Sequence, residues 1–400
     1  MRAVRAVRAV LVAGALLVGG QSVARADKPI TNGDYSIDFY DGVALGNTAL
    51  VGMGGTGEGW LVGTAGVLIN PAAIAVRQTT DSDSWNWDYH IDYLNAALST
   101  DYDNNGTVSS DAGQQYLTIG LGGRYHDWAV AVTATGQAEK LNNDSDTLAE
   151  LSAAALRVRF ALAKWLPSKD IAIGLGVQAV TFSLHNAEAS ALPDQKSELF
   201  SITGGGIIGG VTWVPAWRSY RAGIDVETVI FGGNISTKCD PMDCDGYILP
   251  TSIRSPSRAI VGGAYRFAPT EWNRPINGEF RDERAVTVAA DLYVTGSSPN
   301  SYGIEAFGEK MLQRSGEHVA VSVRGGAELE ALPGRLRLRA GSYWEPQRFE
   351  GVAGRLHGTF GLEVRVFDVN VWGRRRGRIS LTGDVADRYR NIGFSIGFWH

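Results

Sequence analysis

The ten residues Asn391–His400 read NIGFSIGFWH and alternate strictly between two faces. One face carries Ile392, Phe394, Ile396 and Phe398; the other carries Asn391, Gly393, Ser395, Gly397 and Trp399. This alternation is typical of a β-strand, because successive side chains of a strand point to opposite sides. Roughly a dozen further stretches after residue 84 alternate in the same way, with turn residues between them. The sequence therefore predicts a large antiparallel sheet.

The two faces of these stretches differ in chemistry. We expect the apolar face to contact lipid, with Val286, Val288, Leu292, Val319, Val321, Val323, Phe360, Leu362 and Phe394. We expect the opposite face to point inward, with Arg157, Arg159, Asp225, Glu227, Arg324, Glu328, Arg337, Arg339, Glu363 and Arg365. Unpaired charges are costly to bury, so this face predicts a polar lumen that is hydrated or plugged.

A soluble β-sandwich also alternates, with its apolar face forming a core. Here the stretches are about ten residues or longer, which is the length that crosses a bilayer at a tilt. Closure into a barrel would also remove the exposed edges of so long a sheet. We therefore predict an all-β fold, a transmembrane antiparallel barrel of about 14 strands, an even number being typical of bacterial barrels. The stretch 302–313 has the weakest pattern of the candidates.

The N-terminus reads as a secretory signal, with Arg2, Arg5 and Arg8 before the apolar run Ala9–Gly20 and an A-x-A site at residues 24–26. A membrane-anchor helix is the alternative, but this run is too short to span a bilayer. We divide the chain into a signal peptide (1–26), a glycine-rich N-terminal segment (27–75) and the barrel (76–400). The net charge is −5, and the four arginines of 1–26 leave −9 for the remainder, which argues against a nucleic-acid partner.

Both cysteines of the chain, Cys239 and Cys244, lie in one short loop. An exported chain meets an oxidising compartment, so we predict a disulfide between them. A metal site made of these cysteines and nearby aspartates is the alternative, although no histidine lies close by in the sequence.

Two segments resemble the FadL-type family of outer-membrane transporters. Residues 44–73 begin with Ala-Leu-Gly-Asn, are rich in glycine and end in Asn-Pro-Ala-Ala, which is similar to the family's N-terminal hatch. Residues 337–346, RLRAGSYWEP, and the following 356–359 resemble two late strands of the family. These matches bracket the barrel, so the resemblance covers most of residues 27–400.

The resemblance implies a fourteen-stranded barrel in the outer membrane of a Gram-negative bacterium, with the N-terminal segment folded inside the lumen as a hatch. It implies passive uptake of hydrophobic molecules, such as long-chain fatty acids or hydrocarbons, that pass the hatch and leave sideways through the wall. It assigns the hatch role to Asn70, Pro71 and Ala72, for which an ordinary turn is the alternative. Its partners would be outer-membrane lipid, a hydrophobic ligand and, during biogenesis, the barrel-assembly machinery. Apolar residues of the segment could line the ligand pocket: Leu50, Val51, Met53, Trp60, Leu61 and Leu68.

Related families with this hatch motif act in secretion, so a non-transporting scaffold or secretion accessory is the alternative function; a general porin ranks below it. We predict no enzyme and no cofactor. Residues 393–397 match the nucleophile elbow G-x-S-x-G, but the alternation runs straight through Ser395, where that motif needs a sharp turn. Residues 52–57 match G-x-G-x-x-G without a following βαβ unit. Asp101, Asp103 and Asn105 resemble the start of a calcium loop, but position twelve is Ala112, and a hairpin turn fits better.

The disulfide gives a first testable prediction. A maleimide reagent should label Cys239 and Cys244 only after reduction, because a disulfide sulfur does not react as a thiol. Mass spectrometry of the untreated and the reduced protein measures the labelling. Complete labelling of untreated protein would contradict the pairing.

Overall fold

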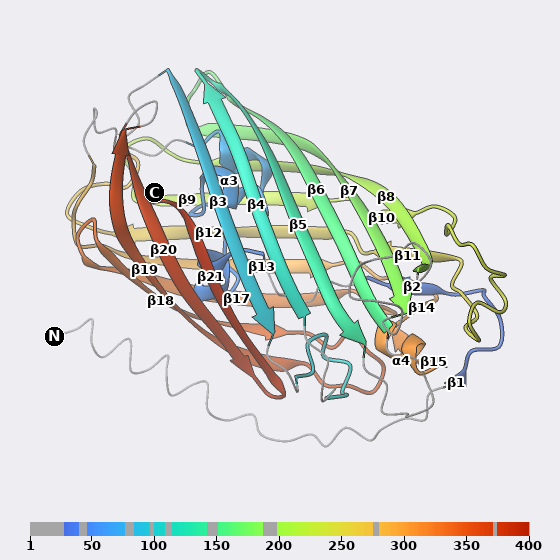
Figure 1. Ribbon diagram of the computed structural model, residues 1–400. Helices are drawn as coiled ribbons and strands as arrows, with labels where there is room; N and C mark the ends of the chain where they lie inside the picture. Colours follow the sequence, from blue (N-terminus) through green and yellow to red (C-terminus); the bar gives the residue numbers. More distant parts are fainter. Residues whose placement is uncertain are drawn as a thin grey trace.

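The computed structural model describes residues 28–39, 46–76, 84–96, 100–108, 114–141, 151–186, 198–274, 280–370 and 374–399. Fourteen of the strands in these residues form one closed antiparallel barrel (Figure 1). These strands are β3 (Trp85–Ala96), β4 (Gln114–Tyr125), β5 (Trp128–Leu141), β6 (Leu151–Trp165), β7 (Ile171–Asn186), β8 (Glu198–Trp213), β9 (Tyr220–Glu227), β12 (Arg258–Phe267), β13 (Val286–Thr295), β17 (Ala320–Leu332), β18 (Leu336–Glu345), β19 (Arg355–Asn370), β20 (Arg374–Ala386) and β21 (Tyr389–Phe398).

The barrel closes where the last strand meets the first. Strand β21 pairs antiparallel with β3, with Asn391 opposite Ala96 and Gly397 opposite His90. Each of the fourteen strands consequently has a hydrogen-bonded neighbour on both sides. The predicted fold and strand number are confirmed. The weak stretch 302–313 does not join the wall; it folds as β14 (Ser301–Tyr302), α4 (Ile304–Gly308) and β15 (Met311–Leu312).

The predicted inward and outward faces are also confirmed. The nine residues expected to face lipid are all exposed on the outer surface, and Val323 is 61% exposed. Their neighbours in sequence point inward, and Arg324 is 4% exposed. Phe398 shares the outward parity of Phe394 but is buried, because the rings of Trp87 and Tyr89 pack against it with centroids 4.9 and 4.7 Å away.

The N-terminal segment lies inside the barrel (blue in Figure 1). Its two short helices and 3-10 turn are α2 (Thr48–Gly52), α3 (Gly63–Gly66) and η1 (Pro71–Ile74), and nearly all of their residues are buried. Before them, β2 (Ser36–Asp38) pairs in parallel with β11 (Ser252–Ser255) and β14, while β1 (Lys28–Pro29) pairs with β15. The predicted signal peptide, residues 1–26, lies outside the described residues, and so does the junction 77–83 between hatch and barrel.

Most long connections gather at one end of the barrel. The other end, where the C-terminus lies, has mostly short connections, apart from the long one between β12 and β13 (Figure 1). The long-connection end, here the outer end, holds β2, β10 (Ile230–Gly232), β11, β14, α4, β15 and β16 (Arg314–Ser315). Cys239 and Cys244 form a disulfide in one of these connections, as the sequence predicts. Within the described residues, no helix is long and apolar enough to cross a membrane.

The outward face gives a second prediction. Val323 and Val319 lie on the same face and are 61% and 58% exposed, but Val319 lies just before the first residue of β17. Val323→Arg should destabilise the barrel in bilayers by about 2–4 kcal/mol, and Val319→Arg by about 0–1 kcal/mol, because an arginine near the end of a strand reaches the headgroups. Denaturant titration of protein folded into liposomes measures both values. Equal effects would show that this face does not cross the bilayer as assigned.

Candidate functional site

Three wall aspartates bind the backbone of residues 46–76, the part of the N-terminal segment that we call the hatch from here on. Asp92 of β3 accepts hydrogen bonds from the backbone N–H and the hydroxyl of Thr48, at 2.9 and 3.0 Å, at the start of α2. Asp88, also on β3, accepts the N–H of Thr64 at 2.6 Å, at the start of α3. Asp291 of β13 accepts the N–H groups of Gly57 and Glu58 at 2.7 and 3.1 Å. Asp92 and Asp88 thus satisfy backbone donors that short helices leave unpaired, and Asp291 satisfies those of the turn between α2 and α3.

Glycines of the wall leave room for the predicted hatch motif, Asn70-Pro71-Ala72. A Cβ atom at Gly174 would overlap the backbone of Pro71 and Ala72, and one at Gly210 would overlap the Asn70 side chain. The motif therefore sits directly against β7 and β8, where a larger residue would displace it.

Asn70 is the centre of this contact. Its Oδ1 accepts the N–H of Ala72 at 2.9 Å and so caps η1. Its Nδ2 donates to Glu58 at 3.0 Å and to the carbonyl oxygens of Val211 and Ile224, both at 3.2 Å. Burial raises the pKa of Glu58 well above its usual value, although the hydrogen bond from Asn70 opposes this shift. Asn70 thus joins the hatch to two wall strands.

The six apolar hatch residues proposed as a ligand pocket do not come together in one place. Leu50 and Leu68 pack on Ile260 and Tyr293 of the wall, with Leu61 at the edge of this cluster. Met53 and Trp60 pack in a second cluster with Ala264 and Ala289 of the wall, and Val51 in a third with Leu94 and Tyr116. These side chains fasten the hatch to the wall, and their role in ligand binding stays a prediction.

The largest apolar cluster lies instead at the outer end of the lumen. It is formed mainly by inward-facing wall residues and by the chain just before the hatch: Tyr35, Ile37, Phe39, Leu151, Val180, Phe182, Leu184, Phe200, Ile202, Ile230 and Ile253. A small pocket that opens to solvent lies within it, lined by Phe39, Phe182, Ile202 and Ile253 among others. An apolar chamber in a lumen that is otherwise polar is suited to an apolar ligand.

A second, larger cavity lies below the hatch, at the short-connection or inner end, with about 1080 Å³ of empty space that continues into solvent. Its walls carry dense ion pairs; Arg339, for example, contacts Glu328 at 2.8 Å and Glu363 at 2.9 Å. Most of the inward charges predicted from the sequence are thereby paired across neighbouring strands, which offsets the cost of burying them.

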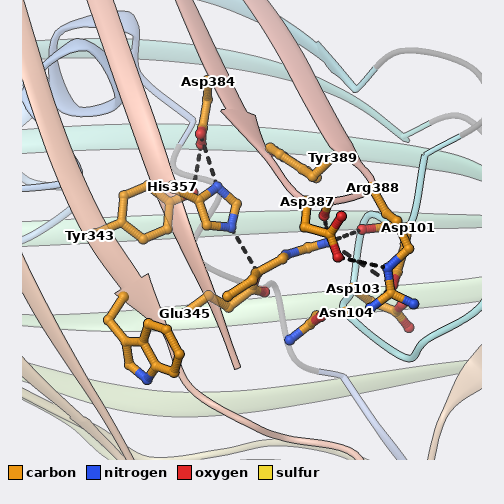
Figure 2. Close-up of polar contacts among 12 residues, drawn as sticks. Asp101, Asp103, Asn104, Tyr343, Glu345, His357, Asp384, Asp387, Arg388 and Tyr389 are labelled. Carbon is orange, nitrogen blue, oxygen red and sulfur yellow. Dashed lines mark hydrogen bonds and ion pairs between the residues drawn. The ribbon is translucent and has the colours of Figure 1, made fainter. Parts of the chain in front are cut away.

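Sequence reasoning missed a buried polar network near the outer end (Figure 2). His357 of β19 lies between Asp384 and Glu345, with both ring nitrogens 2.9 Å from a carboxylate oxygen. The ring of Tyr343 stacks on His357 at 4.2 Å, and its hydroxyl contacts Asp384 at 2.5 Å. The sequence shows no relay spacing because these residues come from three strands. All of them are buried and mutually bonded, so the network ties β18, β19 and β20 together.

The calcium-like loop is built as an Asx turn. Asp101 accepts the N–H groups of Asn105 and Gly106 at 3.0 and 3.1 Å, and Asp103 also accepts that of Asn105 at 3.1 Å. Arg388 lies 3.8 Å from Asp101 and supplies positive charge there. In the part of the chain that the structure describes, no group of three or more His, Cys, Asp or Glu side chains could hold a metal ion. Ala112 lies outside that part.

Ser395 is fully buried and bonded to Thr48 of the hatch and Ser380 of β20, at 2.8 and 2.6 Å. The strand runs straight through it, without the turn that a nucleophile elbow needs.

Solved structures with a similar fold include outer-membrane transporters of other bacteria. A FadL homologue from Pseudomonas aeruginosa superposes with a TM-score of 0.55 at 12% identity, over 89% of this chain and 98% of that one. The chain therefore has the fold of a FadL-type barrel. The toluene transporter TbuX from Ralstonia pickettii gives a TM-score of 0.52 at 14% identity, over 88% of this chain and 97% of that one. The toluene transporter TodX from Pseudomonas putida gives 0.50 at 14%, over 92% and 99%. No family model and no curated protein matches the sequence.

The glycine contact gives a third prediction. In the FadL-type barrel, Gly174→Ala should push Pro71 and Ala72 away from β7 and raise the ion conductance of single channels in planar bilayers. Gly358→Ala is the matched control, because a Cβ at Gly358 in β19 has no atom within 4 Å. Conductance that is equally low in both variants would show that this contact does not hold the hatch closed.

Proposed function

We propose that the protein is a channel in the outer membrane of a Gram-negative bacterium through which hydrophobic small molecules enter passively. The observation that carries this proposal is the apolar chamber at the outer end, where Phe39, Phe182, Ile202 and Ile253 face a cavity. A general porin presents polar side chains to a water-filled pore, and it would have no use for such a chamber. A non-transporting scaffold would also have none.

The hatch fits the same function. It fills the lumen between the outer chamber and the inner cavity, so water and ions meet a barrier of packed side chains. Its contacts with the wall are hydrogen bonds from backbone groups and the packing of apolar side chains, both of which can be exchanged for other partners. A ligand that enters the chamber could therefore shift the hatch without unfolding the wall.

The ligands we propose are fatty acids or hydrocarbons. The solved structures that share the fold support this class, because they include transporters of toluene and a channel for monoaromatic hydrocarbons. Those proteins are channels and transporters rather than enzymes, which agrees with a role without catalysis.

Filling the chamber gives the fourth prediction. Ile202→Trp should reduce uptake of radiolabelled toluene into proteoliposomes by about tenfold, because the larger side chain occupies the cavity that Ile202 lines. Ile207→Trp is the control: it lies on the same strand, is 59% exposed and faces outward. Uptake that both variants retain in full would exclude the chamber from the route, and a wild-type protein without uptake would favour the scaffold.

A further inference from the structure

Within the part of the chain that the structure describes, one arginine on the wall of the inner cavity has no acidic partner. Arg221 of β9 lines this cavity and is 4% exposed. Its Nε–H donates to Asn273 Oδ1 at 2.7 Å. Among the described residues no carboxylate pairs with it, and no hydrogen bond occupies its two terminal nitrogens. The other arginines named in this cavity, such as Arg339, have acidic partners.

The position of Arg221 is fixed from two sides. Asn273 is held in place because its Nδ2 donates to the carbonyl oxygens of Pro215 and Tyr220, at 2.9 and 3.0 Å. The ring of Trp272 lies under the guanidinium, 4.2 Å from its central carbon. Contact with an aromatic face stabilises a cation but does not neutralise it. The connection between β12 and β13 therefore holds the guanidinium of Arg221 at the cavity wall.

The surroundings add positive charge. Arg266 and Arg281 also line the cavity, and the two share one carboxylate, Glu283, at 2.9 and 3.8 Å. Burial lowers the pKa of Arg281, and the charge of Arg266 lowers it further, whereas Glu283 opposes the shift. Arg266 and Arg281 thus share one directly paired carboxylate, and Arg221 beside them has none among the described residues. Burying a cation without a partner is unfavourable, and a bound anion at this corner would offset that cost.

The cavity wall beside Arg221 is apolar. Trp60 and Leu61 of the hatch pack against Trp272, and all three line the cavity. The indole N–H of Trp60 is already donated to the carbonyl oxygen of Thr56 at 2.9 Å, so its ring offers the cavity an apolar surface. A ligand at this corner would contact the guanidinium of Arg221 at one end and the rings of Trp60 and Trp272 at the other.

We propose that Arg221 is the centre of a binding site for a small organic carboxylate, whose apolar body lies on Trp60, Leu61 and Trp272. The free edge of a guanidinium matches the two oxygens of a carboxylate, and this bidentate pairing is stronger than a neutral hydrogen bond. The inference rests on the proposed function only for the route by which a ligand arrives; binding itself can be measured without passage. The site would make the inner cavity selective for amphipathic anions among the molecules that pass the hatch.

Calorimetric titration of the intact, detergent-solubilised protein with benzoate tests the proposal. The wild type should bind benzoate on the order of tenfold more tightly than acetate, because acetate lacks the apolar body. Arg221→Met should weaken benzoate binding on the order of tenfold or more, and Arg221→Lys should retain part of it, since lysine keeps the charge but not the fork.

Arg274→Gln is the matched control. Arg274 lies in the connection that also carries Trp272 and Asn273, but it is exposed and does not line the cavity. It should bind benzoate like the wild type. An equal loss in this variant, or acetate bound as tightly as benzoate, would overturn the proposal, as would wild-type protein that takes up toluene but binds no benzoate. Benzoate binding that depends on Arg221 in a protein without toluene uptake would uphold this site and contradict only the proposed transport.

Discussion

The fold depends on one requirement: inside a bilayer every backbone N–H and C=O group must find a partner within the protein. The pairing of β21 with β3 meets it, because it removes the last free edge of the wall. Closure forces alternate side chains into the lumen, and the sequence places charges there. Those charges need partners, which other strands and the hatch supply. The ion pairs, the hatch and the two cavities all follow from a wall that has no edge.

The wall in turn shapes the hatch. Asp88, Asp92 and Asp291 receive its backbone donors, while Gly174 and Gly210 leave space for Asn70 and Pro71. Charge and shape act together here: Asp92 and Asp88 fix where α2 and α3 begin, and the glycines fix how closely the Asn70–Ala72 motif approaches the wall. Glycine in a strand interior usually weakens the strand. Gly174 and Gly210 thus reduce the stability of the wall, but they allow the hatch to pack closely against it.

Alternation let the sequence predict strands, faces and strand number, because it is a local property. The sites depend on contacts between distant residues, such as that of Thr48 with Ser395, 347 positions apart, and no local pattern reports them. The apolar chamber at the outer end does have a signal in the sequence of β7. In β7, Leu175 and Val177 are exposed, whereas Val180, Phe182 and Leu184 are buried. The apolar residues thus change from odd to even positions within one strand, which marks where the lumen becomes apolar.

The hatch helices have only four or five residues each. Helices this short do not persist in water, because nucleation costs more than one turn returns. Contacts with the wall therefore stabilise these helices. If α2 loses its contact with Asp92, or η1 its contact with Gly174 and Gly210, each should unfold instead of moving as a rigid body. If the hatch is displaced, we expect its residues to lose their order together, and its backbone amides should exchange with solvent far faster than those of the strands around it.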